Sequence, residues 1–144
     1  MAMVRLVALF GLSVSCALVA FEGALAACPD GYPKPDVEFR DAVLVVVGEV
    51  MSRRQAGPPA KGWYDGSEYA VRVTETFKGH AKAVIHLFSE NSSGRFEMEV
   101  GTVYLLYVTA DRSEKPTVYY ISNCGNSAPA AEREALLTQL RKSQ

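Results

Sequence analysis

Two cysteines are the residues of this chain whose chemistry is easiest to interpret. Cys28 directly follows Ala24-Leu25-Ala26-Ala27, and Cys124 lies towards the carboxyl end. Two cysteines in an exported chain most simply form a disulfide, which an oxidising compartment preserves. A Cys28–Cys124 bond would close a loop of nearly the whole mature domain, to which the chain-entropy treatment assigns about 4–5 kcal/mol. We therefore expect this bond to hold the amino-terminal segment against a distant part of the fold.

The same junction has a second interpretation. Leu25-Ala26-Ala27-Cys28 also fits a bacterial lipobox, in which the cysteine becomes the lipidated first residue. Lipoproteins usually continue with a flexible polar tether, whereas Pro29 and a structured-looking sequence follow here. Lipidation would also leave Cys124 as an odd thiol. The disulfide is the favoured prediction, and a lipid anchor at Cys28, with the membrane contact it brings, stays the alternative.

The other side chains that could do chemistry are scattered. His80 and His86 fall on a turn and a strand, without the spacing of a zinc site, and His86 is predicted to point outward. Glu97 and Glu99 lie on one side of a predicted strand, and such pairs usually form a solvated face. No nucleophile elbow, phosphate-binding loop or zinc-helix motif occurs. The sequence predicts neither an enzyme nor a bound metal or cofactor.

The amino terminus has the layout of an export signal. Arg5 precedes an apolar run over residues 6–21, and Ala24-Leu25-Ala26 forms a cleavage site. The run falls short of the ~20 apolar residues that a membrane span needs. Residues 1–27, with Cys16 among them, are therefore predicted to leave as a signal peptide. A single domain over residues 28–144 would remain, secreted or periplasmic, in an organism that the short signal suggests is bacterial.

The charge of the chain is nearly balanced. The formal net charge is -1 at pH 7, and the predicted signal carries one basic residue, Arg5, and one acidic residue, Glu22. The mature domain therefore keeps the same net charge. A nucleic-acid-binding domain normally shows a basic patch or stripe. The composition thus argues against nucleic acid as a partner.

The strongest strand signal lies at residues 42–50. This segment is rich in β-branched residues and apolar on both faces at its start, which is typical of the long first strand of a closed barrel. Gly48 would allow a bend where the sheet coils. Upstream, three prolines keep residues 28–36 extended along a surface or edge, and residues 37–41 are expected to form a helical turn.

Residues 52–67 break all periodicity and are predicted to form one long loop. Loops longer than about 12–15 residues in compact domains are usually functional or disordered. Trp63 and Tyr64 lie in this segment, and Trp, Tyr and Arg are the types enriched at binding hot spots. A tip that folds back and buries Trp63 on the barrel is the alternative. Both residues are candidates for binding a partner.

The remaining elements complete a mainly β domain. Further strands are expected over residues 69–74, 83–88, 100–108 and 117–122. A helix should follow Gly125, capped by Asn126 or Ser127, with Pro129 in its first turn and an apolar stripe at Leu136, Leu137 and Leu140. The prediction is a five-stranded β-barrel with a carboxyl-terminal amphipathic helix, the architecture of the OB-fold.

The order of these features resembles a known family. The matching residues are Cys28-Pro29 with Pro33, Asp41-Ala42-Val43-Leu44-Val45, Thr76-Phe77-Lys78-Gly79, Ser92-Ser93-Gly94, Val100-Gly101 with Tyr104-Leu105-Leu106, and Ile121-Ser122-Asn123-Cys124. Together they resemble the netrin-like domain, and within it the amino-terminal domain of the tissue inhibitors of metalloproteinases, especially their short bacterial relatives. The resemblance spans nearly the entire mature chain, and it implies an OB-fold with a Cys28–Cys124 disulfide.

The chain departs from these inhibitors at a second disulfide. In them, a cysteine at the mature amino terminus is bonded to one between the serine and glycine of the fourth-strand turn. Here Ser93 runs straight into Gly94, and no second cysteine stands at the start of the mature chain. In the inhibitors that terminal cysteine stands two residues ahead of the position matched by Cys28, and it chelates the protease zinc through its amino group and carbonyl. Cleavage after Ala26 would start the mature chain at Ala27-Cys28, one residue short of that arrangement, whereas cleavage after Ala27 would place the free amine on Cys28 itself.

These observations predict an exported binding module without catalytic activity. We expect it to engage a protein partner through Cys28, Pro29 and Asp30 on one edge, with Trp63 and Tyr64 beside them. Inhibition of a zinc metalloprotease is the sharpest form of this hypothesis. The alternatives are a lipid-anchored envelope protein and a module that binds oligosaccharide or single-stranded nucleic acid on the barrel face.

Overall fold

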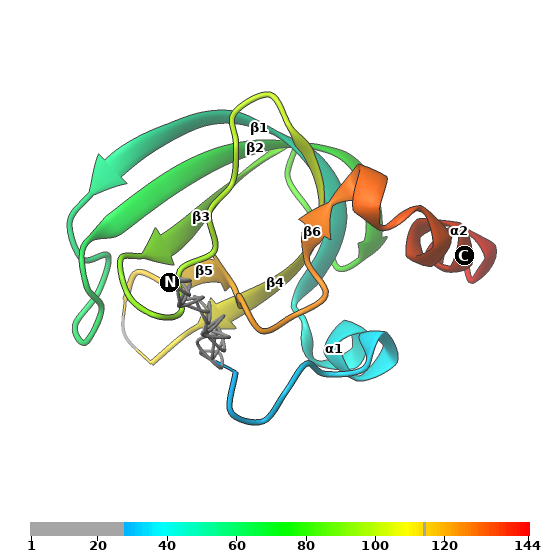
Figure 1. The fold of residues 1–144 in the computed structure, drawn as a ribbon. Helices are drawn as coiled ribbons and strands as arrows, with labels where there is room; N and C mark the ends of the chain where they lie inside the picture. Colours follow the sequence, from blue (N-terminus) through cyan, green and yellow to red (C-terminus); the bar gives the residue numbers. More distant parts are fainter. Residues whose placement is uncertain (1–27, 114) are drawn as a thin grey trace, which may run out of the picture.

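The computed structural model describes residues 28–113 and 115–144 (Figure 1). The predicted signal peptide, residues 1–27, lies outside the described residues. The elements, in chain order, are α1 (Pro35–Asp41), β1 (Leu44–Ala56), β2 (Gly66–Lys78), β3 (Val84–Glu90), β4 (Val103–Asp111), β5 (Val118–Ile121), β6 (Ala128–Pro129), the 3₁₀ turn η1 (Ala130–Glu132) and α2 (Glu134–Lys142). None of the helices in this part of the chain has the length and apolar character to cross a bilayer.

Five of the strands form a ring. The sheet order is β1-β2-β3-β5-β4-β6, and an additional β1–β4 pairing joins the first and fifth members of this series. Neighbouring strands are antiparallel except β3 and β5, which are parallel and pair through Phe88 and Tyr120. The predictions of a mainly β fold and of a helix at the carboxyl end are confirmed.

The first half of strand β1 is buried on both faces, as its sequence predicts. Val46 and Val50 belong to a cluster inside the ring, together with residues of β2, β3, β4 and β5. Val45 and Val47 point the other way and pack in an outer cluster with Leu137 of α2. Fully burying a valine side chain stabilises a fold by roughly 1.5–3 kcal/mol. The alternating valines of one strand therefore hold the ring interior and the outer layer together.

Gly48 marks an irregularity in β1. The register of β1 against β2 shifts between Val47 and Gly48. A Cβ atom at position 48 would lie 2.5 Å from Cγ1 of Val71 and 3.0 Å from the carbonyl oxygen of Arg72. Glycine in a strand often marks a bulge or a close backbone approach. The bend predicted at Gly48 corresponds to such a close approach between β1 and β2.

The prediction of a loop over residues 52–67 is wrong at both ends of that range. Strand β1 continues to Ala56 and β2 begins at Gly66, so that only residues 57–65 connect them. The two extensions pair with each other from Ser52 opposite Ala70 to Ala56 opposite Gly66. Residues 51–55 are exposed and mostly polar, so they show no apolar alternation. Pairing with β2, including a contact of 2.8 Å between Arg54 and Glu68, forms this ribbon.

The start of the carboxyl-terminal helix is also corrected. Helix α2 begins at Glu134, because the residues predicted to cap it are engaged elsewhere. Asn126 donates its backbone N–H to Glu38 over 2.6 Å, and the Ser127 hydroxyl accepts the backbone N–H of Tyr107 over 2.8 Å. Ala128 and Pro129 then pair with β4 as the short strand β6. Long-range contacts therefore override a local capping signal.

Two smaller boundaries differ from the sequence prediction. Helix α1 begins at Pro35, inside the segment predicted to be extended, because proline suits the first turn of a helix. Strand β4 begins at Val103, and Gly101 has a positive φ of 85° in the turn before it. Glu97 and Glu99 are exposed, as predicted, but they lie outside any strand.

Candidate functional site

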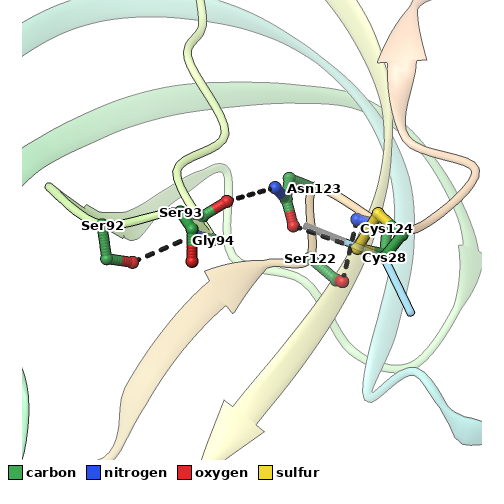
Figure 2. The surroundings of a disulfide bond; sticks show 7 residues. All are labelled: Cys28, Ser92, Ser93, Gly94, Ser122, Asn123 and Cys124. Carbon is green, nitrogen blue, oxygen red and sulfur yellow. Dashed lines mark hydrogen bonds between the residues drawn. A yellow bond between two sulfur atoms is a disulfide. The ribbon is translucent and has the colours of Figure 1, made fainter. Parts of the chain in front are cut away.

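The Cys28–Cys124 disulfide is present and ties the amino-terminal segment to the turn after β5 (Figure 2). The two Cα atoms lie 5.5 Å apart, although 96 residues separate the cysteines in sequence. A sulfur bonded to Cys124 cannot also carry a lipid thioether. The structure therefore shows the disulfide form of the junction.

The residues after Cys28 make an exposed turn. The backbone N–H of Gly31 donates to the carbonyl oxygen of Cys28 over 3.0 Å, and Gly31 adopts a positive φ of 74°. Pro29 and Asp30, the other two predicted edge residues, are exposed. They border a shallow pocket of about 260 Å³ whose far side is formed by Ser122 and the Cys124 turn. The predicted edge is thus an accessible surface built on the disulfide.

A second turn is held to the same place by Asn123. The side-chain amide of Asn123 donates to the carbonyl oxygen of Ser93 over 2.7 Å (Figure 2). Within that turn, the Ser92 hydroxyl donates to a Glu90 carboxylate oxygen over 2.8 Å and accepts the backbone N–H of Gly94 over 3.1 Å. The turn at residues 90–94 is therefore fixed beside the disulfide by Ser92 and Asn123, which belong to the family pattern but for which the sequence predicted no contact.

The tip of the β1–β2 hairpin reaches the same turn. The backbone N–H of Asn91 donates to the carbonyl oxygen of Asp65 over 2.8 Å, and the backbone N–H of Tyr64 lies 3.5 Å from Oε2 of Glu90. Four segments are thus linked in series: residues 63–65, 90–94, 122–125 and 28–31. We call this continuous edge the disulfide rim. It brings together all five residues that the sequence predicted for binding.

Trp63 anchors the hairpin tip on the sheet. Its ring makes edge-to-face contacts with Phe88 and Tyr120, with centroids 5.8 and 5.3 Å away. Its indole N–H donates to Asp111 Oδ2 over 3.0 Å. Hydrogen bonds from Ser113, followed by the one from Trp63, hold the pKa of Asp111 below its ordinary value of 3.8. Trp63 therefore lies half-buried and positions its neighbour, which is the folded-back arrangement considered from the sequence.

Tyrosine side chains are exposed along the rim. Tyr64 is 64% exposed, and Tyr32, next to Gly31, is 68% exposed. The sequence singled out Tyr64 for its place in the predicted loop, but nothing distinguished Tyr32 from the seven tyrosines of the chain. Tyrosine is enriched at binding hot spots because it supplies apolar area with a polar end. The rim thus presents aromatic area to the solvent.

The rim is also acidic. Its four segments contain the carboxylates of Asp30, Asp65 and Glu90 and no lysine or arginine. The chain as a whole has a formal net charge of -1, so this concentration is local. Charge that is complementary across an interface steers association and suppresses wrong partners. The chemistry of the rim therefore suits a partner surface that is basic or carries a cation.

The remaining candidate groups lie outside the rim. His86 points outward, as predicted, and its Nδ1 lies 3.2 Å from Oε1 of Glu68. Tyr107 lies in the outer cluster, where burial, with a contribution from Glu38, raises its pKa to about 12. Within residues 28–113 and 115–144, no group of three histidine, cysteine, aspartate or glutamate side chains is arranged to hold a metal ion.

Comparison of the chain with protein-family models and with curated protein sequences finds no match. The functional inference therefore rests on the geometry of the rim and on the residue pattern of the chain.

Proposed function

We propose that this protein is an exported binding module of the OB-fold class that engages a protein partner through the disulfide rim. The observation that carries the proposal is the linkage of four sequence-distant segments into one edge by a disulfide and main-chain hydrogen bonds. A surface that is already fixed loses less conformational entropy when it binds. The exposed Tyr64 and the carboxylates supply contact area and charge on that fixed frame.

The netrin-like resemblance supports this proposal. The tissue inhibitors tie their fourth-strand turn to the mature amino terminus by a second disulfide. In this chain the corresponding turn, Ser92-Ser93-Gly94, is tied instead by the Asn123 side chain, which donates to Ser93. Asn123 immediately precedes Cys124, so the hydrogen bond and the disulfide act on adjacent residues. In the proposed correspondence, a hydrogen bond from the residue before Cys124 replaces the disulfide that joins this turn to the amino terminus in the inhibitors.

Inhibition of a zinc metalloprotease is the sharper form of the proposal. If the signal is cleaved after Ala27, the free α-amine of Cys28 stands on the acidic, accessible rim. The Cys28 carbonyl oxygen accepts one hydrogen bond, from Gly31, and a carbonyl oxygen has two lone pairs. An amine nitrogen and a carbonyl oxygen on one residue can chelate a zinc ion in an open catalytic site.

The inhibitory form is tested with a panel of zinc proteases. Residues 28–144, with the disulfide formed, are expected to inhibit at least one protease at micromolar concentration. A matched protein that retains Ala27 moves the α-amine away from Cys28 and should lose the inhibition. If every protease of the panel stays fully active with both proteins, metalloprotease inhibition is excluded, and the proposal of a protein-binding module remains.

The broader proposal is tested by site-specific cross-linking in the exporting cell. A photoreactive side chain at position 64 should trap one protein reproducibly, and the capture should be lost in the Asp30→Lys variant. A matched probe at Met51, which is 46% exposed on the ribbon outside the rim, should trap nothing of the same mass. Equal capture from both positions would count against recognition through the rim.

Binding of a polyanion on the sheet face has less support. Most exposed arginines of the described chain are paired with carboxylates, as in Arg54–Glu68 and Arg72–Glu49 on the strands and Arg141–Glu75 between α2 and β2. Paired arginines present little net positive charge to phosphate or sulfate groups. Retention on heparin that falls steeply with salt would instead favour this alternative.

A further inference from the structure

A second opening lies at the other end of β3. Phe88 pairs with Tyr120 of β5, but Val84–Leu87 pair only with β2. Strands β3 and β5 therefore separate over the part of β3 that precedes Phe88. The divergence leaves a groove of about 510 Å³ between β3, β5 and the start of β1. Ligand pockets typically measure about 300–1,000 Å³. The groove is therefore large enough for a small molecule and separate from the rim.

The floor of the groove is apolar. Leu44 and Val84, which is 37% exposed, supply accessible apolar area, whereas Leu87 and Val108 belong to the inner core and are 1% and 0% exposed. Tyr119, which is 41% exposed, forms part of the wall. Burial of apolar area contributes roughly 25 cal/mol per Å². The floor and wall would thus favour a ligand with an apolar body.

Apart from Tyr119, the polar side chains that line the groove are two histidines, a lysine and an arginine. His80, Lys82, His86 and Arg112 line the groove, and no aspartate or glutamate does so among the described residues. The neighbouring carboxylate of Asp111 accepts hydrogen bonds from Trp63 and Ser113 and so is engaged towards the rim. Glu68 contacts His86 through Nδ1. Lys82 and Arg112 therefore bring two positive charges to the groove, and neither forms an ion pair with a described residue.

Arg112 differs from the other arginines of the described chain. It is the one arginine in residues 28–113 and 115–144 for which neither a hydrogen bond nor an ion pair is formed. The others, Arg40, Arg53, Arg54, Arg72, Arg95, Arg133 and Arg141, all have polar partners. A guanidinium group presents five donors in a fork that suits a carboxylate. Arg112 at the groove is thus free to bind one.

We propose that this groove binds a small amphiphilic anion, an organic acid with one carboxylate and an apolar chain of medium length. The chain would lie over Leu44, Val84 and Tyr119, and the carboxylate would meet Arg112 and Lys82. A polyanion would gain nothing from the apolar floor, and a neutral lipid would leave the cations unused. The proposal is independent of the rim and of any partner bound there.

The direct test is a titration of isotope-labelled residues 28–144 followed by amide NMR. Octanoate is expected to shift the amides of Val84–Leu87 and Arg112. Acetate, which has the charge without the chain, and 1-octanol, which has the chain without the charge, should each bind at least about ten-fold more weakly, or by ~1.4 kcal/mol. Octanoate that shifts no groove amide at millimolar concentration, or 1-octanol that binds equally well, would overturn the proposal.

Two variants that lose the same charge distinguish an effect of the groove on binding from an effect of the overall charge. Arg112→Gln with Lys82→Gln should weaken octanoate binding about ten-fold, whereas Arg40→Gln with Lys142→Gln, the same loss of charge outside the groove, should change it by less than about two-fold. Thermal unfolding of both variants verifies that they are folded. Equal weakening in the two variants would overturn the proposal, as would binding to anionic vesicles or heparin without any binding of octanoate.

Discussion

The side-chain amide of Asn123 donates to the carbonyl oxygen of Ser93 over 2.7 Å, and it does so one residue away from the Cys28–Cys124 disulfide. The Asn123 Oδ1 atom also lies 3.3 Å from Sγ of Cys124. One amide group therefore touches both the disulfide and the turn at residues 90–94. The disulfide rim owes its continuity to this contact, because the disulfide itself does not reach that turn.

Replacing Asn123 should loosen the rim without unfolding the domain. Asn123→Ala removes one hydrogen bond, which is expected to lower the free energy of unfolding by about 0.5–1.5 kcal/mol. Amide exchange at residues 91–95 should accelerate more than in the ring strands, as hydrogen-exchange mass spectrometry would show. The control is Asn91→Ala, since Asn91 is exposed and only its side chain contact with Arg95 would be lost. Equal acceleration in both variants would contradict the role of Asn123.

The disulfide should be visible in the protein recovered from its native host. The intact mass is expected to lie two hydrogens below that of the reduced mature chain, because Cys28 is bonded to Cys124. Added diacylglycerol would contradict this and would favour the lipid-anchored alternative. In the purified domain, changing both cysteines to serine should lower the free energy of unfolding by about 2–5 kcal/mol, as measured by urea denaturation.

Trp63 should report the protonation of Asp111. The hydrogen bonds of Ser113 and Trp63 lower the pKa of Asp111 in the folded state below 3.8, so the stabilisation is complete above the unfolded pKa. It is lost as the pH falls through the lower folded value. Because Trp63 is the single tryptophan, its emission should change with a midpoint below pH 3.8. Asp111→Asn should abolish that transition, and its persistence would contradict the assignment.

Gly48 should be intolerant of a side chain. Gly48→Ala places a Cβ atom 2.5 Å from Val71 Cγ1, and such overpacking typically costs 1–3 kcal/mol, which equilibrium unfolding measures. Gly57 provides the matched control, because a Cβ there meets no atom within 4 Å and its φ is not positive. Gly57→Ala in the hairpin tip should change stability by no more than about 0.5 kcal/mol. Similar losses for the two variants would contradict the close approach at Gly48.

The sequence predicts those elements whose local pattern and burial agree. Val45, Val46 and Val47 read as a strand buried on both faces, and both faces are covered in the structure. Residues 52–55 carry no such pattern, since they are exposed and their strand character comes from pairing with β2. The capping signals at Asn126 and Ser127 mislead for a related reason. Their side chains serve Glu38 and Tyr107, which are distant in sequence.

The residues of the candidate site likewise divide into those that local sequence identifies and those whose role depends on tertiary contacts. Cys28, Pro29 and Asp30 are recognisable because a cysteine after an export signal is chemically distinctive, and Tyr64 because two aromatic residues stand together. Ser92 and Asn123 belong to the family pattern, but their contacts and the role of Glu90 could not be predicted, because these depend on which turns meet in space. The groove beside Arg112 was equally invisible, since it arises where two strands diverge.

The outer cluster, which packs α2 on β1 and β4, is separate from the cluster inside the ring. Helix α2 is held by Leu137 on the outside of β1 and β4 and by the ion pair between Arg141 and Glu75, with 2.8 Å between Nη2 and Oε2. None of these contacts involves the ring interior. We expect α2 to open at a lower free energy than the ring strands, because its contacts lie outside the ring interior. Limited proteolysis should then trim the carboxyl terminus before it cleaves the ring.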